Sequence, residues 1–300
     1  MKQLILLLLL ILGTFTAEAQ MKYGFKTGLN FAHIDGESET GTDGANLESW
    51  KNTTGFHIGM TLSYKFTDHF GLRGELLYSK RGGKYTFDGP SYRIFRHTSG
   101  SILTTGTSKY LINVNNSYID LPVMAYGRFG DFEISGGGYV GFLVQSAGEG
   151  SLQYSGKTAL GNAVYANPDK TATLLDFNLN HNYRRDDPGA GSSESDSEVP
   201  INVKVDGFIA ETPKTMGAYY DQPQGKDQLY TNLDFGLVGG VSYYISSALY
   251  LGVRLQYGLA DITNKGADLS KASVDSNGGL IFRDDKDKNF MIQASVGFSF

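Results

Sequence analysis

The sequence lacks cysteine, an excess of positive charge and, after its first residues, long apolar runs, and each absence excludes a class of protein or site. Its 300 residues include no cysteine, which excludes disulfides, thiolate metal sites and cysteine nucleophiles. The 26 Lys and Arg are outnumbered by 31 Asp and Glu, and a net charge of −5 argues against nucleic-acid binding. After the first residues, no apolar run approaches the ~18 residues of a membrane-spanning helix. What is abundant is glycine (39), tyrosine (19) and phenylalanine (18), a composition that favours strands.

The N-terminal residues have the pattern of an export signal. A cationic Met1–Lys2 precedes the apolar stretch Leu4–Leu12, and Ala17–Ala19 matches a small-residue cleavage site. The apolar stretch is about half as long as a membrane-spanning helix, although an N-terminal anchor helix is the alternative. We therefore expect residues 1–19 to be a cleaved signal peptide and residues 20–300 to be the mature chain.

Eight segments of the remaining chain alternate strictly between two kinds of residue. They are residues 23–32, 56–66, 70–79, 119–126, 132–144, 233–243, 249–257 and 290–300. One face of each segment is apolar, and the other combines Gly and Ser with scattered charges. A soluble β-sandwich shows the same period, but an apolar outer face around a small, polar interior is typical of a transmembrane barrel. The segments also have about the 9–11 residues with which a tilted strand crosses a bilayer.

The connections between these segments alternate in length. Three are short, near residues 67–69, 128–131 and 246–247, and four are long, near residues 34–55, 81–117, 145–232 and 260–289. This alternation is typical of outer-membrane barrels. The sequence thus predicts an all-β fold, an eight-stranded antiparallel up-and-down transmembrane β-barrel with long extracellular loops and short periplasmic turns. Residues 20–300 would form this single outer-membrane β-barrel domain. Both termini would be periplasmic, in the outer membrane of a Gram-negative bacterium.

Five stretches of sequence resemble a known family. They are Tyr23–Asn30, Leu72–Gly82, Tyr118–Val123, Asp234–Gly240 and Arg254–Leu259. In this order they are similar to the PorT-like outer-membrane β-barrel family of Bacteroidetes-type bacteria. The resemblance covers most of the expected strands and implies an eight-stranded outer-membrane barrel. It implies no single activity, and the 145–232 connection is longer than the family would lead one to expect.

Two of the long connections carry features of their own. The alternation continues into the 81–117 connection, so we expect its flanking strands to project outward as a ribbon. The edge of such a ribbon could pair with another strand, or the ribbon could simply stiffen the loop. The stretch Asp186–Glu198 holds five acidic residues and no basic one. It is either a divalent-cation or partner site or, in the simpler interpretation, a solvated loop tip.

No motif indicates catalysis, a metal site or a cofactor. His33 and His57 are expected near the outer rim of neighbouring strands, but no motif places a nucleophile or an acid beside them. Metal-ligand spacings are absent as well. We therefore predict no catalytic, cofactor-binding or metal-binding residues and a protein that is not an enzyme.

The inward-facing charges suggest a structural cluster. Counted from the short turns, Glu75, Asp120 and Arg254 reach similar depths, and Arg73 lies just below them. We expect these four residues to form a lumen charge cluster in which Arg254 pairs with Glu75 or Asp120. The alternative is a wet lumen that screens the charges from one another.

An eight-stranded lumen is narrow enough for side chains to fill, which argues against free diffusion of solutes. The prediction is a non-enzymatic barrel that binds at the cell surface or serves an envelope or secretion assembly. The alternatives are a structural protein without a ligand, a small porin-like channel, and an enzyme with an active site at the outer rim. Expected partners are outer-membrane lipid and lipopolysaccharide, the barrel assembly machinery and an envelope or secretion protein. Phe300 ends the sequence on an aromatic residue, either as an assembly signal or as a simple packing contact.

Overall fold

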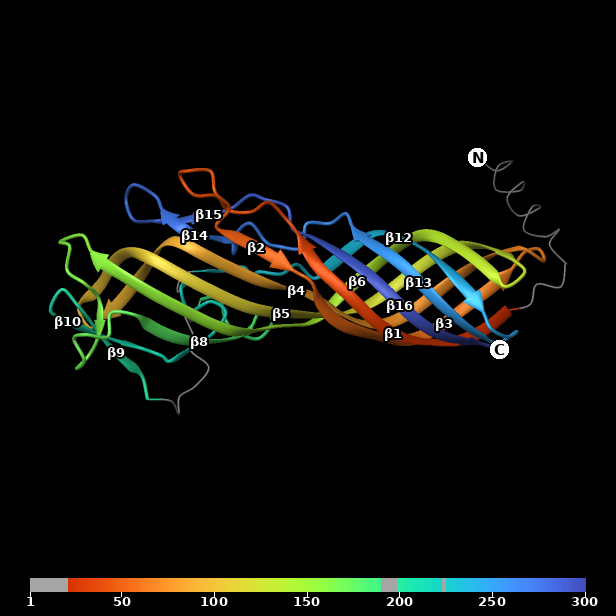
Figure 1. Ribbon diagram of the computed structural model, residues 1–300, viewed down its shortest axis with the longest axis horizontal. Coiled ribbons are helices and arrows are strands. Elements are labelled where there is room, and N and C mark those ends of the chain that lie inside the picture. The colour runs from red at the N-terminus through yellow and green to blue at the C-terminus, as the bar shows by residue number, and fades with distance from the viewer. Residues whose placement is uncertain (1–20, 190–198, 223–224) are drawn as a thin grey trace, which may run out of the picture.

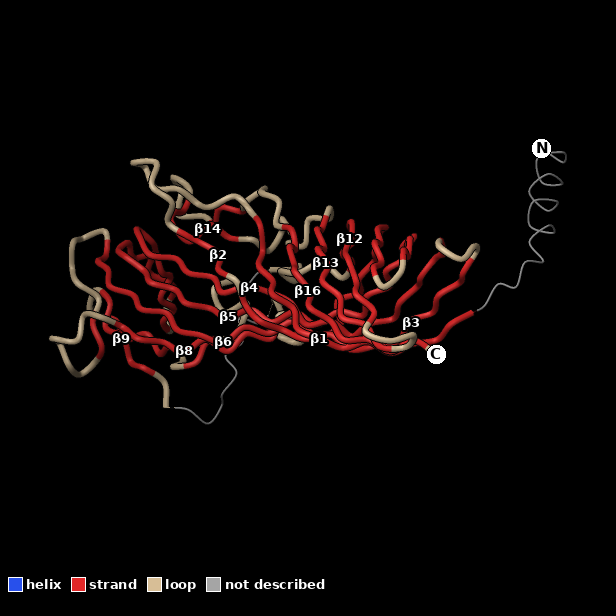
Figure 2. Tube along the Cα trace, turned by 45° about the vertical axis from the view of Figure 1, so that its right-hand side comes forward, coloured by secondary structure: helices blue, strands red, loops and turns tan. Residues whose placement is uncertain are grey.

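The computed structural model describes residues 21–189, 199–222 and 225–300, and Figure 2 shows them as strands and loops. No helix within these ranges is long and apolar enough to cross a membrane. The predicted signal peptide, residues 1–19, lies outside the described residues.

Eight strands form a closed antiparallel ring. They are β1 (Met21–Asp35), β3 (Thr53–Lys65), β4 (Phe70–His97), β5 (Gly100–Phe129), β6 (Phe132–Thr158), β12 (Leu233–Tyr244), β13 (Leu249–Gly258) and β16 (Lys288–Ser299). Each strand pairs with its neighbours in this order, and β16 closes the ring by pairing with both β13 and β1. The predicted eight-stranded barrel is confirmed.

The outer surface of the barrel is an apolar belt. Met60 is 64% exposed, Val123 59% and Leu237 59%, although all three belong to paired strands. The alternate positions of the same strands point inward and carry buried polar side chains such as Glu75 and Gln293. Because the side-chain period of a strand is two, the alternation read from the sequence assigns these two faces directly.

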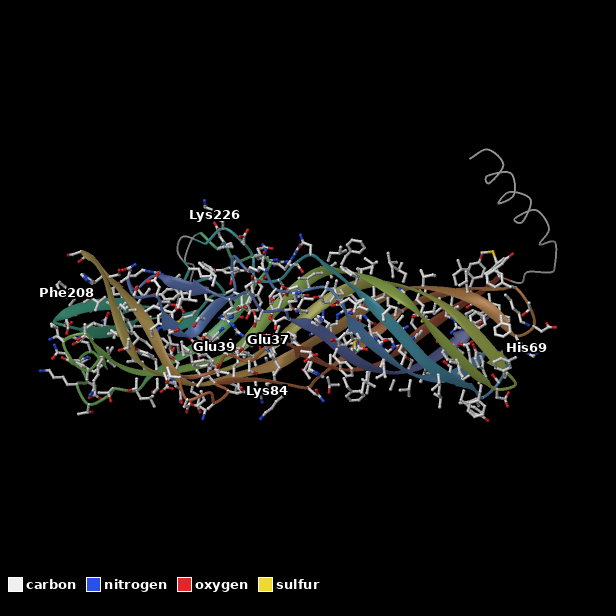
Figure 3. The ribbon with its side chains drawn as sticks, turned by 90° about the horizontal axis from the view of Figure 1, so that it is seen from above. Glu37, Glu39, His69, Lys84, Phe208 and Lys226 are labelled. Carbon is white, nitrogen blue, oxygen red and sulfur yellow. The ribbon has the colours of Figure 1, made fainter. Side chains whose placement is uncertain are left out.

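The two ends of the barrel differ. Residues 66–69, 130–131 and 245–248 make the connections at one end, which we call the short-turn end. The opposite end carries the remaining connections, which together form a second body that we call the cap: residues 36–52, 82–116, 145–232 and 259–287, as far as they are described (Figure 1). In Figure 3, His69 lies at the short-turn end and Phe208 at the far end of the cap.

The cap is built mainly by strands that leave the barrel without a break. β4 and β5 stay paired from Phe70↔Gly127 to His97↔Gly100, so the 81–117 segment is a ribbon as expected. The edge of the ribbon on the β5 side is covered, because β6 pairs with β5 as far as Thr104↔Thr158. The expectation of a loop from residue 145 onward was wrong for its first part, since β6 continues to Thr158.

Further short strands complete the cap. β2 (Glu48–Lys51) pairs with β4, while β8 (Leu175–Asn182) and β11 (Thr215–Met216) extend the sheet beyond β6. β7 (Tyr165–Ala166), β9 (Ile201–Val205) and β10 (Phe208–Thr212) form a small separate sheet, and β14 (Leu269–Val274) pairs with β15 (Leu280–Phe282).

A bulge in β6 marks the passage from barrel to cap. Ser117 pairs with Gln145 but Tyr118 pairs with Leu143, so Val144 is one residue too many. Val144 and Gln145 are both exposed, and the inward face moves from odd-numbered to even-numbered residues. An extra residue in one strand shifts its alternation by one position. The sequence pattern therefore ends at Val144, although the strand does not.

The main hydrophobic core lies in the cap. Its buried members include, in β4, Tyr85, Phe87 and Phe95, in β5, Ile112 and Val114, in β6, Leu152 and Tyr154, and in β8, Leu175, Phe177 and Leu179. The interior of the barrel is by contrast lined by charged and amide side chains.

Candidate functional site

Three layers of charged side chains cross the interior of the barrel, and β4 contributes to each of them. Arg73, Glu75 and Arg81 occupy odd-numbered positions of β4, and all three are buried. Since successive side chains of a strand point to opposite faces, this spacing directs all three into the lumen. Their partners come from other strands, so each layer joins the barrel walls across the interior.

The layer nearest the short-turn end joins Arg73 to Glu133 of β6. Arg73 Nη1 and Nη2 donate to Glu133 Oε1 and Oε2 at 2.6 and 2.8 Å, a bidentate pair. The hydroxyl of Tyr244 in β12 donates to Glu133 Oε2 at 3.0 Å. The Tyr126 ring faces the guanidinium, 4.9 Å from its centroid. This layer is electrically neutral and links β4, β6 and β12.

The middle layer joins Glu75 to two cations. Arg254 Nη1 of β13 lies 2.6 Å from Glu75 Oε2, and Lys26 Nζ of β1 lies 3.5 Å from the same oxygen. Arg254 also donates through Nε to Gln293. The cavity beside this layer has a volume of about 20 Å³, roughly the space of one water molecule.

The upper layer places Arg81 between two carboxylates. Arg81 Nη1 lies 2.8 Å from Asp120 Oδ2, and Arg81 Nη2 lies 2.9 Å from Asp234 Oδ2. Asp234 Oδ2 also accepts hydrogen bonds from the Tyr139 hydroxyl at 3.0 Å and from Asn289 Nδ2 at 2.9 Å. The excess positive charge of the middle layer and the excess negative charge of the upper layer balance each other.

The four residues expected to form one cluster are distributed over all three layers. Arg254 lies against Glu75, whereas Asp120 pairs with Arg81 one layer higher and Arg73 pairs with Glu133 one layer lower. Counting residues from the turns ignores the stagger between tilted strands, which moves equal counts to different depths.

The cluster proposed from sequence also lacked four members: Lys26, Arg81, Glu133 and Asp234. Lys26 and Asp234 stand on the inward face of the sequence pattern, and this signal could have identified them. Arg81 is the first residue of the 81–117 connection, which is expected to leave the barrel as a ribbon, so the sequence pattern does not count Arg81 among the lumen residues.

The two histidines considered for catalysis differ in their surroundings. His57 is fully buried in the lumen, with Nδ1 2.7 Å from Asn30 Oδ1 and Nε2 3.0 Å from Ser295 Oγ. His33 instead packs its ring 4.9 Å from that of Phe290. The Ser295–His57–Asn30 chain has the order of a nucleophile–base–orienter arrangement. Ser295 borders the cavity of about 20 Å³, which has no room for a substrate, so this chain is part of the lumen packing.

The cap contains a larger cavity of about 130 Å³. It lies between the extended sheet, which contributes Arg93, Tyr110 and His181, and the segment around β14, which contributes Lys271. Burial lowers the pKa of His181 to about 3, so this imidazole is neutral at physiological pH. Its Nδ1 lies 2.9 Å from the Tyr183 hydroxyl.

A group of three carboxylates begins at the edge of this cavity, since Asp268 is part of the cavity lining. Oxygens of Asp268, Asp285 and Asp287 fall within 4.8 Å of one another. Burial raises the pKa of both Asp268 and Asp287 to about 7. Arg283 pairs with Asp285 at 2.5 Å and with Glu48 at 2.6 Å. Protonation and Arg283 together reduce the repulsion within this group.

The acidic stretch singled out in the sequence is described only as far as Gly189, and residues 190–198 lie outside the described residues. Asp186 Oδ2 accepts hydrogen bonds from the backbone N–H groups of Asn182 at 3.0 Å and Ala218 at 2.8 Å. Through these two hydrogen bonds, Asp186 connects the segment that follows β8 to Ala218, which follows β11.

Residues 17–264 match the family model described as "Outer membrane protein beta-barrel domain". None of the curated proteins matches the chain. Among solved structures, Ail of Yersinia pestis, crystallised with a heparin analogue, is 12% identical over 94% of this chain and 99% of its own, with a TM-score of 0.31. OprG of Pseudomonas aeruginosa is 13% identical over 94% and 97%, with a TM-score of 0.33. The protease OmpT of Escherichia coli is 8% identical over 96% and 98%, with a TM-score of 0.27. Similarities this low carry no information about what this chain binds or does.

Proposed function

Because the chain belongs to the family of outer membrane β-barrel domains, we propose that it is a non-conducting barrel of the Gram-negative outer membrane that holds a binding cap at the cell surface. The proposal is that of a binding protein without enzymatic activity. Its lumen serves to fix the barrel, and its cap provides the surface for recognition.

The observation that carries this proposal is the contrast between the two interiors. The three charged layers link β4 to β5, β6, β12 and β13 inside the lumen, and the cavity beside the middle layer holds about one water molecule. A channel for solutes needs a continuous aqueous path, which larger barrels provide. The cap, in contrast, has a hydrophobic core and a cavity of about 130 Å³. The space for a ligand is therefore in the cap.

Conductance tests the first half of the proposal. Purified, folded protein inserted into planar bilayers is expected to give no steady open-pore current. A variant with smaller side chains in two layers, Arg73→Ala with Arg254→Ala, serves as the control that shows whether emptying the lumen produces current. Reproducible ohmic steps from the unmodified protein would reject the filled lumen and favour the porin-like alternative.

Labelling in intact cells tests the orientation. We propose that the cap is extracellular and that the short turns and both termini are periplasmic. The natural chain has no cysteine, so single cysteines at exposed positions report without background. A membrane-impermeant maleimide should label Lys170→Cys in the cap but leave Asp68→Cys at the short-turn end unlabelled. The opposite pattern would invert the topology.

We propose one kind of partner for each of three surfaces of the protein, namely the apolar belt, the last strand of the barrel and the cap. Outer-membrane lipid and lipopolysaccharide would cover the apolar belt, and the barrel assembly machinery would recognise the strand that ends in Phe300. That strand meets β1 through the Phe300 N–H, which donates to the Tyr23 carbonyl at 2.7 Å. Cross-linking from cap positions in cells would distinguish a role in an envelope or secretion assembly, which requires one stoichiometric protein partner, from recognition of small molecules.

A further inference from the structure

The cap cavity is enclosed by segments that are far apart in the sequence. Its lining includes Arg93 of β4, Tyr110 of β5 and Leu152 of β6 on the side of the extended sheet. Lys271 of β14 lies on the opposite side, where the Ser91 hydroxyl donates to its carbonyl oxygen at 2.6 Å and so fixes β14 against β4. The cavity is therefore part of the cap's tertiary structure rather than a gap between loose loops.

Arg93 is part of the cavity lining, and one of its guanidinium nitrogens has unused hydrogen-bonding capacity. Its side chain is 2% exposed, and its Nη2 donates to Asp221 Oδ1 at 2.9 Å. Its Nη1 has no hydrogen-bond partner among the described residues. A buried guanidinium N–H without an acceptor is costly, since the group has lost its water and gained nothing in return. An acceptor supplied by a ligand would remove this cost.

Lys271 provides a second cation at the same cavity. Its ammonium lies 4.9 Å from the centroid of the Tyr85 ring and 5.9 Å from that of Tyr110. Within the described part of the chain, it forms no ion pair closer than 4 Å. Burial raises the pKa of Tyr110 to about 12, and the neighbouring Arg93 opposes this shift. Tyr110 thus stands between the two cations.

The walls define the shape and the charge of an occupant. Four tyrosines line the cavity, namely Tyr92, Tyr110, Tyr183 and Tyr220, and offer flat rings against which another ring can pack. A volume of about 130 Å³ is close to that of an engineered cavity of about 150 Å³ that holds benzene. The carboxyls of Asp221 and Asp268 also line the cavity. Burial raises the pKa of Asp268 to about 7, and while Asp268 is protonated the two cations exceed the remaining carboxylate by one charge, so the cavity can accept one negative charge but not two.

The cavity has a route to the surface. Asp221 is exposed, with 46% of its side chain accessible, while Tyr220 and Lys271 are half-buried. The lining thus includes residues that reach the surface as well as the buried Arg93.

We propose that the cap cavity binds a small monocarboxylate carried on a six-membered ring. This inference rests on the surface-binding function proposed above and names its ligand class. The carboxylate accepts from Arg93 Nη1 and is attracted by Lys271, and the ring packs among the tyrosines. Two sources share this chemistry, a sugar acid and an aromatic acid, and separate probes distinguish them.

The test uses the full-length protein folded in detergent and isothermal titration with four organic compounds and inorganic phosphate. Sodium glucuronate and sodium benzoate are the acids, and glucose and benzyl alcohol are their neutral counterparts. At least one acid should bind, and at least tenfold more tightly than its neutral counterpart. Binding of glucuronate alone assigns a sugar acid, and binding of benzoate alone assigns an aromatic acid. Failure of both acids, equal binding of the neutral compounds, or tighter binding of inorganic phosphate overturns the proposal.

Variants locate the site. Arg93→Gln should weaken binding of the acid at least tenfold and Lys271→Gln several-fold, while the exposed control Lys170→Gln should leave it unchanged. Lys271→Gln removes a half-buried cation without leaving a buried carboxylate unpaired, so it remains informative if Arg93→Gln fails to fold. Unchanged binding in Lys271→Gln contradicts the proposal. The conductance and labelling tests do not depend on the ligand, so a non-conducting barrel with an external cap that binds neither acid refutes only the ligand class.

Discussion

The barrel and the cap share three strands, yet their interiors are opposite in character. Along β4 the inward positions carry Arg73, Glu75 and Arg81 within the barrel, and Tyr85 and Phe87 in the cap. In the bilayer, hydrocarbon surrounds the protein and the apolar side chains face outward. In the cap, water surrounds the protein and the same face of the strand must be apolar. One continuous sheet can therefore have two kinds of interior, each determined by the solvent around it.

The largest expected effect concerns the upper layer, at the boundary between the two regions. Arg81→Gln leaves Asp120 and Asp234 buried without a counter-charge, which should cost on the order of 3–5 kcal/mol of unfolding free energy. Urea unfolding of the refolded barrel measures this loss. Lys84→Gln, an exposed change three residues further along β4, is the control. A loss in Arg81→Gln no larger than in the control would show that the lumen is wet enough to screen its charges.

The middle layer should respond asymmetrically. Glu75→Gln leaves both Arg254 and Lys26 without an anion and should cost roughly 3 kcal/mol, whereas Arg254→Gln should cost less because Lys26 still faces Glu75. The charge swap Glu75→Arg with Arg254→Glu should recover part of the loss. Additive losses in the swapped protein would show that the two residues do not act as a pair.

Substitutions at two positions on the same face of β5 test whether one position faces lipid and the other faces water. Val123, in the apolar belt, is 59% exposed, and Leu111, in the cap, is 38% exposed. Val123→Lys should cost about 2–4 kcal/mol in refolded vesicles, the penalty for a cation near the middle of a bilayer. Leu111→Lys should change stability by less than about 0.5 kcal/mol. Equal effects at the two positions would contradict the assignment of the boundary between barrel and cap.

The buried cap carboxylates should make the stability of the cap depend on pH. Asp268 and Asp287 have pKa values raised by burial from 3.8 to about 7. Raised carboxyl pKa values favour the folded cap while the groups are protonated, so this stabilisation is full below about pH 3.8 and is lost as the pH rises through about 7. Tyrosine fluorescence can follow the unfolding of the cap. The midpoint of this unfolding transition should decrease as the pH is raised from 5 to 8. Asp287→Asn should reduce this slope, and an unchanged slope would point to other groups.

The smallest effect on stability is expected at the end of the last strand. Phe300 is 78% exposed, so Phe300→Ala should change the stability of barrel refolded in detergent very little. If this residue is an assembly signal, the amount of folded protein in the outer membrane should fall several-fold in cells. Equal small effects on stability in detergent and on assembly in cells would indicate that Phe300 has only a packing role. Normal assembly of the variant would show that Phe300 is not an assembly signal.

The sequence predicted the barrel well because a lipid-facing strand must repeat its pattern every two residues. The same rule fails at Val144, where one extra residue reverses the faces of β6. It also gave no warning that residues 175–182 form β8, since this strand packs on the cap and not in the bilayer. In the lumen, the residue types were identified correctly, but the partners of Arg73 and Asp120 were not, because the stagger between strands is absent from a count along the chain.

The sequence alone thus determined the strand number, the lipid-facing surface and the presence of charges inside, since each depends on local alternation. Only the tertiary structure decided how those charges are divided into layers and how Arg93 and Lys271 come to face one cavity. These residues lie 178 positions apart, from 93 to 271, and meet because β14 folds back onto the extended β4. Such a contact depends on strand stagger and loop packing, neither of which has a periodic signature in the sequence.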